Sequence, residues 1–125
     1  MSQLMKKIII STITLLVLDI AFLSINKTAF ENQVISVQRV IMQMNPVGAF
    51  FSYLFIVFAI NYFIILKNRS VFEAAILGIV IYGVYESTNY AIFKKWSPHL
   101  AIMDTIWGGS LFALTTHITY ILSNL

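Results

Sequence analysis

Three carboxylic acids lie inside apolar stretches of this sequence: Asp19, Glu86 and Asp104. Ionisable side chains are costly within a membrane, and those that occur there mark helix contacts, ion pathways or proton sites. Asn89 follows Glu86 by three residues, so it adds an amide to the same side of a helix. The chemistry open to these groups is hydrogen bonding between helices, binding of a proton, cation or small substrate, or acid–base catalysis.

The residues around Glu86 predict a helix with one polar, aromatic face. At about 100° per residue, this face occupies about a third of the helix circumference. It contains Gly78, Tyr82, Tyr85, Glu86, Asn89 and Phe93. The opposite side carries Leu77, Val80, Ile81, Val84 and Ala91, and it is suited to contact with lipid.

The composition is that of a membrane protein. The chain has 125 residues, of which 59% are hydrophobic and 10% charged, and its mean hydropathy is +0.86. A soluble domain of this size carries far more charge. The net charge of +3 comes from Lys and Arg residues between the apolar runs, so it indicates binding to the headgroups of a lipid bilayer and not to nucleic acid. The absence of cysteine excludes disulfides and thiolate metal sites.

Four apolar runs are each long enough to cross a bilayer, at residues 8–25, 47–66, 71–93 and 100–122. We therefore predict an all-α fold, an integral membrane four-helix bundle that forms a single domain over residues 1–125. A cleaved signal peptide is the rival interpretation of the first run. Asp19 inside its apolar core argues against cleavage.

The connection between the first two runs predicts an amphipathic helix on the membrane surface. Phe30, Val34, Val37 and Ile41 recur at spacings of three and four residues, which predicts a helix over residues 29–44. Asn45-Pro46 then ends this helix.

An up-down-up-down order of the four spans brings the three carboxylic acids together. Each then lies about 6 to 10 Å below the same membrane interface, at 1.5 Å of rise per residue. Tyr82, Tyr85 and Asn89 are the expected hydrogen-bond donors, and we expect that the three acids are not all ionised at neutral pH. Trp107 and Gly108 lie close to Asp104 in sequence, and Gly108 allows a neighbouring helix to approach closely.

Three motifs in order resemble a family of small membrane proteins catalogued as domain of unknown function 2177. They are Leu18-Asp19 with Phe22-Leu23, then Tyr82-Gly83-x-Tyr85-Glu86-x-Thr88-Asn89-x-Ala91 with Trp96 beyond, then Asp104-x-x-Trp107-Gly108. The resemblance covers nearly the whole chain. It implies four spans and members in bacteria and large DNA viruses, and it brings no established activity.

We favour a structural membrane component, of a cell or of a virion, in which the carboxylates and amide hold the bundle together. The alternative is proton, cation or small-substrate binding or transport through Asp19, Glu86 and Asp104. A membrane-embedded enzyme is a further alternative, although no catalytic motif is present. We expect no cofactor and no metal, because His99 lies in a turn where it is solvated.

The count of basic residues in the loops does not by itself set the orientation in the membrane, because four on one side balance four on the other. The short basic amino terminus therefore sets the predicted orientation, with both termini in the cytoplasm. The sequence leaves open whether the chain forms a homo-oligomer or joins a larger membrane assembly.

Overall fold

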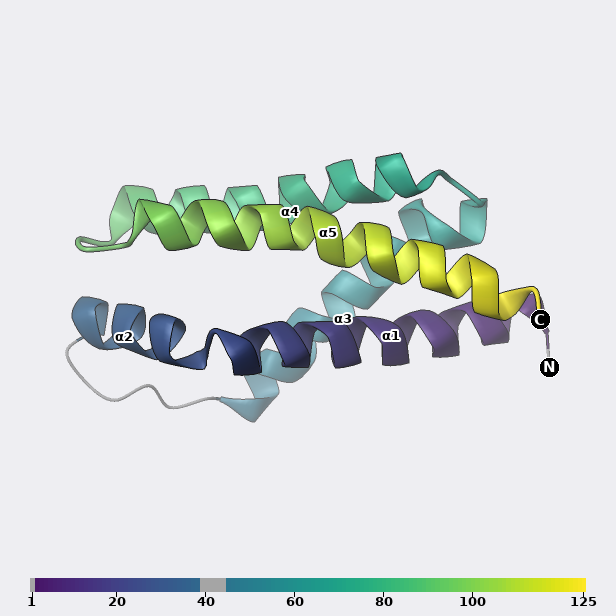
Figure 1. Ribbon diagram of the computed structural model, residues 1–125, viewed down its shortest axis with the longest axis horizontal. Coiled ribbons are helices and arrows are strands. Elements are labelled where there is room, and N and C mark those ends of the chain that lie inside the picture. Colours follow the sequence, from purple (N-terminus) through teal and green to yellow (C-terminus); the bar gives the residue numbers. More distant parts are fainter. Residues whose placement is uncertain (1, 39–44) are drawn as a thin grey trace.

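The computed structural model describes residues 2–38 and 45–125, and over these residues it contains helices and no strands (Figure 1). The order of elements is α1 (Gln3–Ile25), α2 (Lys27–Gln38), α3 (Pro46–Phe63), the short 3-10 helix η1 (Ile65–Lys67), α4 (Val71–Ile92) and α5 (Pro98–Ser123). The all-α prediction is confirmed. Within the described residues, α1, α3 with η1, and α4 are long and apolar enough to cross a membrane.

The helices begin where short polar residues can cap them. Ser70 and Glu73 form a capping box at the start of α4, and Glu73 also pairs with Arg69 at 3.4 Å. Asn45 accepts hydrogen bonds from the first turn of α3, and Ser97 caps α5, whose first residue is Pro98. The polar connections thus fix the ends of the apolar helices.

Glycine residues let α4 and α5 form a closely packed antiparallel pair. A Cβ atom at Gly78 would overlap the carbonyl of Gly108, and one at Gly108 would overlap the ring of Tyr82. A Cβ atom at Gly109 would lie 2.6 Å from Ile79 Cγ1. Small residues of this kind allow helix backbones to approach in lipid, where little hydrophobic force drives helices together.

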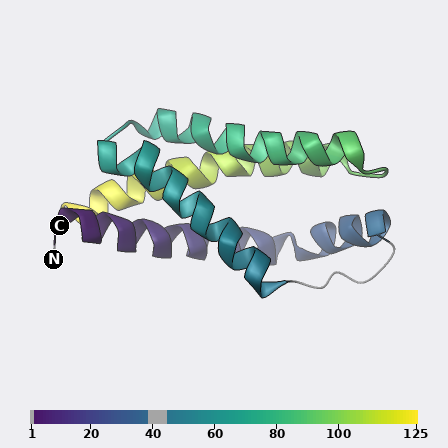
Figure 2. The ribbon, with the colours of Figure 1, turned by 180° about the vertical axis from the view of Figure 1, so that it is seen from behind.

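The first helix runs antiparallel to α5 along its other side, and α3 crosses α1 obliquely (Figures 1 and 2). The centre of the molecule is an apolar layer in which Leu15, Leu111 and Phe112 are fully buried. Outside this core, α3 exposes most of its large apolar side chains, namely Val47, Phe50, Phe51, Leu54, Phe55, Phe58 and Phe63. Such a surface is suited to lipid and not to water.

Helix α2 is present where an amphipathic helix was expected, but its direction differs from the expectation. It continues along the line of α1 and does not turn across the end of the bundle (Figures 1 and 2). The reason lies in its contacts: the ring of Phe30 packs against Phe22 of α1, and the buried Gln33 accepts a 2.7 Å hydrogen bond from the backbone N–H of Ser97. Residues 39–44, which include Ile41, lie outside the described part of the chain.

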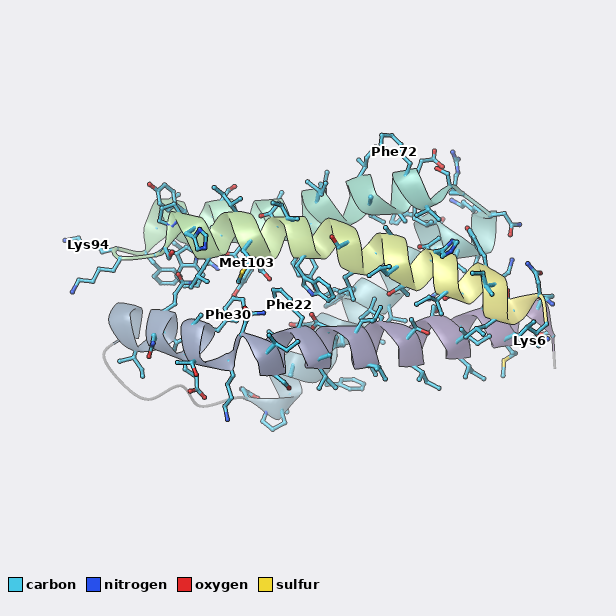
Figure 3. All side chains as sticks on the ribbon, in the orientation of Figure 1. Lys6, Phe22, Phe30, Phe72, Lys94 and Met103 are labelled. Carbon is cyan, nitrogen blue, oxygen red and sulfur yellow. The ribbon has the colours of Figure 1, made fainter. Side chains whose placement is uncertain are left out.

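The two termini lie at the same end of the molecule, opposite the turn between α4 and α5 (Figure 1). The side-chain amide of Gln3 donates to the carbonyl of Ser123 at 3.1 Å. Figure 3 shows Lys6 at this end and Lys94 at the other, while Phe22, Phe30 and Met103 point into the space between α1–α2 and α5.

Candidate functional site

Asp19 joins three helices. It is 6% exposed, and its two carboxylate oxygens accept hydrogen bonds from different elements. The hydroxyl of Tyr53 on α3 donates to Oδ2 at 2.6 Å, and the indole N–H of Trp107 on α5 donates to Oδ1 at 3.0 Å. Because each oxygen has its own donor, the cost of burying this carboxyl is largely offset.

The ring of Trp107 is held from a second side. It stacks on Phe22 with ring centroids 4.5 Å apart and an interplanar angle of 2°. Asp19 and Phe22 are three residues apart on α1, so they share one face of that helix and grip the same indole. This arrangement orients the N–H of Trp107 toward Asp19.

Glu86 and Asp104 form a separate pair between α4 and α5. Glu86 is 3% exposed and Asp104 is 8% exposed, and the two carboxyl groups lie next to each other. Two ionised carboxylates at close range repel each other, so the pair favours a bound proton or a cation. The indole N–H of Trp96, in the turn between the helices, donates to Oε1 of Glu86 at 2.9 Å.

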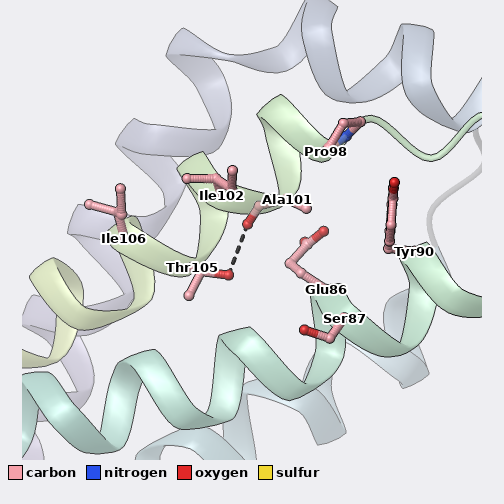
Figure 4. Close-up of a pocket in the computed structure, with 8 residues that line it drawn as sticks. All are labelled: Glu86, Ser87, Tyr90, Pro98, Ala101, Ile102, Thr105 and Ile106. Atoms are coloured by element: carbon pink, nitrogen blue, oxygen red, sulfur yellow. Dashed lines mark hydrogen bonds between the residues drawn. The ribbon is translucent and has the colours of Figure 1, made fainter.

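Glu86 lines a groove of about 320 Å³ between α4 and α5 (Figure 4). Its other lining residues are Ser87, Tyr90, Pro98, Ala101, Ile102, Thr105 and Ile106. Figure 4 shows the Glu86 side chain between the two helices, while the hydroxyl of Thr105 is bonded to the carbonyl of Ala101 at 2.8 Å. The carboxyl is thus the charged group in a mostly apolar groove.

The remaining predicted site residues lie at unequal depth. Tyr82 is partly buried against Gly108 and near Asp19 and Asp104. Tyr85 is 58% exposed, so the structure places it outside the buried site, although it was expected to be a donor. Asn89 is half-buried and lies one helical turn from Tyr85. The buried row of α4 repeats every four residues, through Ala74, Gly78, the partly buried Tyr82 and Glu86, and Tyr85 lies at its edge.

Three side chains that sequence reasoning missed are central to these contacts. Tyr53 and Trp96 donate to the carboxylates, and Gln33 links α2 to the turn before α5. Trp96 stands directly beyond the sequence motif that contains Glu86, and that position was the available signal. Tyr53 is one aromatic residue among many on α3, so no spacing singled it out.

A second polar layer lies nearer the termini. Asn61 of α3 donates to Ser11 of α1 at 2.9 Å, and Thr115 and Thr119 of α5 are fully buried. On α1, Leu15 of the apolar layer lies between Ser11 and Asp19 in the sequence. On α5, Leu111 and Phe112 lie between Trp107, which donates to Asp19, and Thr115. Asn61 therefore belongs to a layer separate from that of the three acids.

The described residues offer little to neutralise the buried acids by charge. Their ion pairs are Lys27–Glu31 and Arg69–Glu73, and neither involves Asp19, Glu86 or Asp104. In residues 2–38 and 45–125, no three His, Cys, Asp or Glu side chains gather as a set of metal ligands. In this part of the chain the groups that stabilise the buried carboxyls are neutral hydrogen-bond donors, namely Tyr53, Trp96 and Trp107.

A comparison with protein families gives one match over nearly the whole chain. The model of the family described as "Predicted membrane protein (DUF2177)" matches residues 4–121. No curated protein and no solved structure matches the chain.

Proposed function

The chain belongs to the DUF2177 family of predicted membrane proteins, and we propose that it serves as a structural membrane component, a four-span bundle held together by its buried carboxyl and amide groups. The two termini then lie on one side of the bilayer. The carboxyl groups and the turn between α4 and α5 lie toward the other side.

The fourth span in this proposal is α5, and its polarity has a structural cause. Its 26 residues extend about 39 Å, which is enough to cross a bilayer. Its polar residues Asp104, Thr115 and Thr119 are buried against other helices. Its exposed large apolar side chains are Ile102, Ile106, Leu114, Ile121 and Leu122, and His117 is exposed on this helix as well. Most of the polarity of α5 is therefore turned toward other helices and not toward lipid.

The observation that carries the proposal is the double acceptance of hydrogen bonds by Asp19. Donors from α3 and α5 meet at a carboxyl of α1, so one side chain fixes the relative positions of three helices. In lipid, polar contacts and close packing replace the hydrophobic force that assembles soluble bundles. A site whose oxygens are both occupied by protein donors is also poorly suited to receive a ligand.

Reconstitution into liposomes tests this function against the transport alternative. A purely structural component gives proton and monovalent-cation flux equal to that of empty liposomes, measured with an internal pH dye and with an ion electrode. Flux above that background that is lost in Glu86→Gln would contradict the structural function. The control is Glu73→Gln, since Glu73 is paired with Arg69 at the surface.

A further inference from the structure

The Glu86–Asp104 pair is less well supplied with donors than Asp19. Asp19 has two donors for its two oxygens, whereas Trp96 is the one N–H group among the described residues that donates to the pair. Both members of the pair are more than nine-tenths buried. A pair of acids in this condition favours a bound proton or an external cation, because protein donors alone do not compensate its charge.

The groove beside the pair has the chemistry of a site for an apolar cation. Its walls are formed by Ala101, Ile102 and Ile106, and Tyr90 adds an aromatic face to which a cation can be attracted. Glu86 supplies the negative charge at the wall, and the hydroxyl of Ser87 lies at an exposed position. Sites for small molecules commonly combine a mostly apolar lining with a few polar groups.

We propose that this groove binds an organic cation with an apolar body, of the substituted ammonium or phosphonium class, whose charge is matched by the Glu86–Asp104 pair. The site is distinct from the structural contacts of Asp19, because it uses different carboxyl oxygens and a different helix pair. Charge complementarity selects this ligand over a neutral lipid, which would leave the carboxyl unmatched.

Binding of the cation displaces the proton that the pair shares. The ionisable groups nearest the pair are Asp19 from α1 and Tyr82 from α4, and the exposed Tyr85 lies beside Glu86 on α4. None of these supplies positive charge. An incoming cation therefore leaves both acids ionised and releases one proton to the solvent, so cation and proton compete for the same site.

The test uses tetraphenylphosphonium and the full chain in detergent. Isothermal titration calorimetry, repeated in buffers of different ionisation enthalpy, should show saturable binding with release of about one proton per cation. Where the pair is protonated, affinity should fall about tenfold for each unit of decrease in pH. Infrared spectra should show a protonated carboxylic acid band that the cation removes.

Two variants separate the groove from the fold. Glu86→Gln keeps an acceptor for Trp96, and it should weaken binding at least tenfold. Ser87→Phe leaves both acids intact and fills the groove from an exposed position, and it should weaken binding similarly. The matched control is Thr88→Phe, which places the same ring on the next residue of α4, outside this groove, and should bind as the wild type does.

The proposal is overturned if tetraphenylphosphonium binds wild type, Glu86→Gln and Ser87→Phe equally, since that result describes partition into detergent or apolar surface. Absence of saturable binding to a folded wild-type chain overturns it as well. Neither result contradicts the proposed structural function, because that function depends on the stability contributed by Asp19. Binding without flux in liposomes is compatible with both proposals.

Discussion

Replacing Asp19 with leucine removes the acceptor that joins α1, α3 and α5. The hydroxyl of Tyr53 and the indole N–H of Trp107 would then lose their partner inside the bundle. Leucine has the same branching and somewhat larger end groups, so the change removes hydrogen bonds without opening a cavity. We expect a folded but less stable protein in which the contact of α1 with α3 loosens first, because few other contacts join these two helices.

The magnitude follows from the number of donors left without an acceptor. A buried donor that loses its partner costs about 1 to 3 kcal/mol, and hydrogen bonds measured within membranes lie near the lower end of that range. Two donors therefore predict a loss of about 2 to 4 kcal/mol for Asp19→Leu. Asp19→Asn keeps one oxygen for Trp107, and its amide can donate to the Tyr53 hydroxyl, so its cost should be about 1 kcal/mol.

Reversible unfolding in mixed micelles, with the denaturing detergent as the titrant, measures these free energies. Thr12→Leu is the matched control, because the Thr12 hydroxyl bonds to the carbonyl of Ile8 within α1 and reaches no other helix. A double-mutant cycle of Asp19→Leu with Tyr53→Phe should give a coupling of about 1 kcal/mol. If Asp19→Leu were as stable as Thr12→Leu, the hydrogen bonds of Asp19 would not hold the bundle together.

Three further predictions concern other contacts. Gly78→Ala should destabilise the protein by about 1 to 3 kcal/mol because its Cβ meets the Gly108 backbone, whereas Gly83→Ala, whose Cβ finds Thr105 at 3.5 Å, should be near neutral in the same unfolding assay. Gln33→Leu should speed amide hydrogen exchange at Ser97 by about tenfold, and unchanged exchange would show that Gln33 does not anchor α2. Single cysteines at residues 2 and 124 should both react with an impermeant maleimide from one side of the membrane, and labelling from opposite sides would contradict four spans.

The ends of the helices could be predicted because they depend on local chemistry. A helix starts where Asn45-Pro46, Ser70 with Glu73, or Ser97-Pro98 stands directly before an apolar run of the right length, whatever packs against it. The same local information gave the all-α class and the family, both of which are confirmed. It could not give the direction of α2, because that depends on where Gln33 finds a partner 64 residues away.

The sequence predicted the acids of the candidate site but not the side chains that donate hydrogen bonds to them. Depth below an interface can be counted along a helix, so Asp19, Glu86 and Asp104 could be assigned to one level. Rotation about the helix axis is set by packing, which decides that Tyr85 is exposed while Tyr53 reaches Asp19. The residues around a donor on another helix do not show which acid it reaches. Because aromatic residues are frequent in this chain, Tyr53 could not be distinguished from the others.

The division of the acids into two groups separates the two roles that a buried carboxyl can have in a membrane. Both oxygens of Asp19 accept hydrogen bonds from the protein, so this carboxyl stabilises helix contacts and has little attraction for a ligand. The Glu86–Asp104 pair has one such donor, Trp96, which donates to Glu86, and Glu86 lines a groove. The pair therefore keeps an attraction for positive charge. Loss of stability should therefore follow substitutions at Asp19, and loss of cation binding should follow substitutions at Glu86. A variant of Asp19 that abolished binding without any loss of stability would contradict this separation.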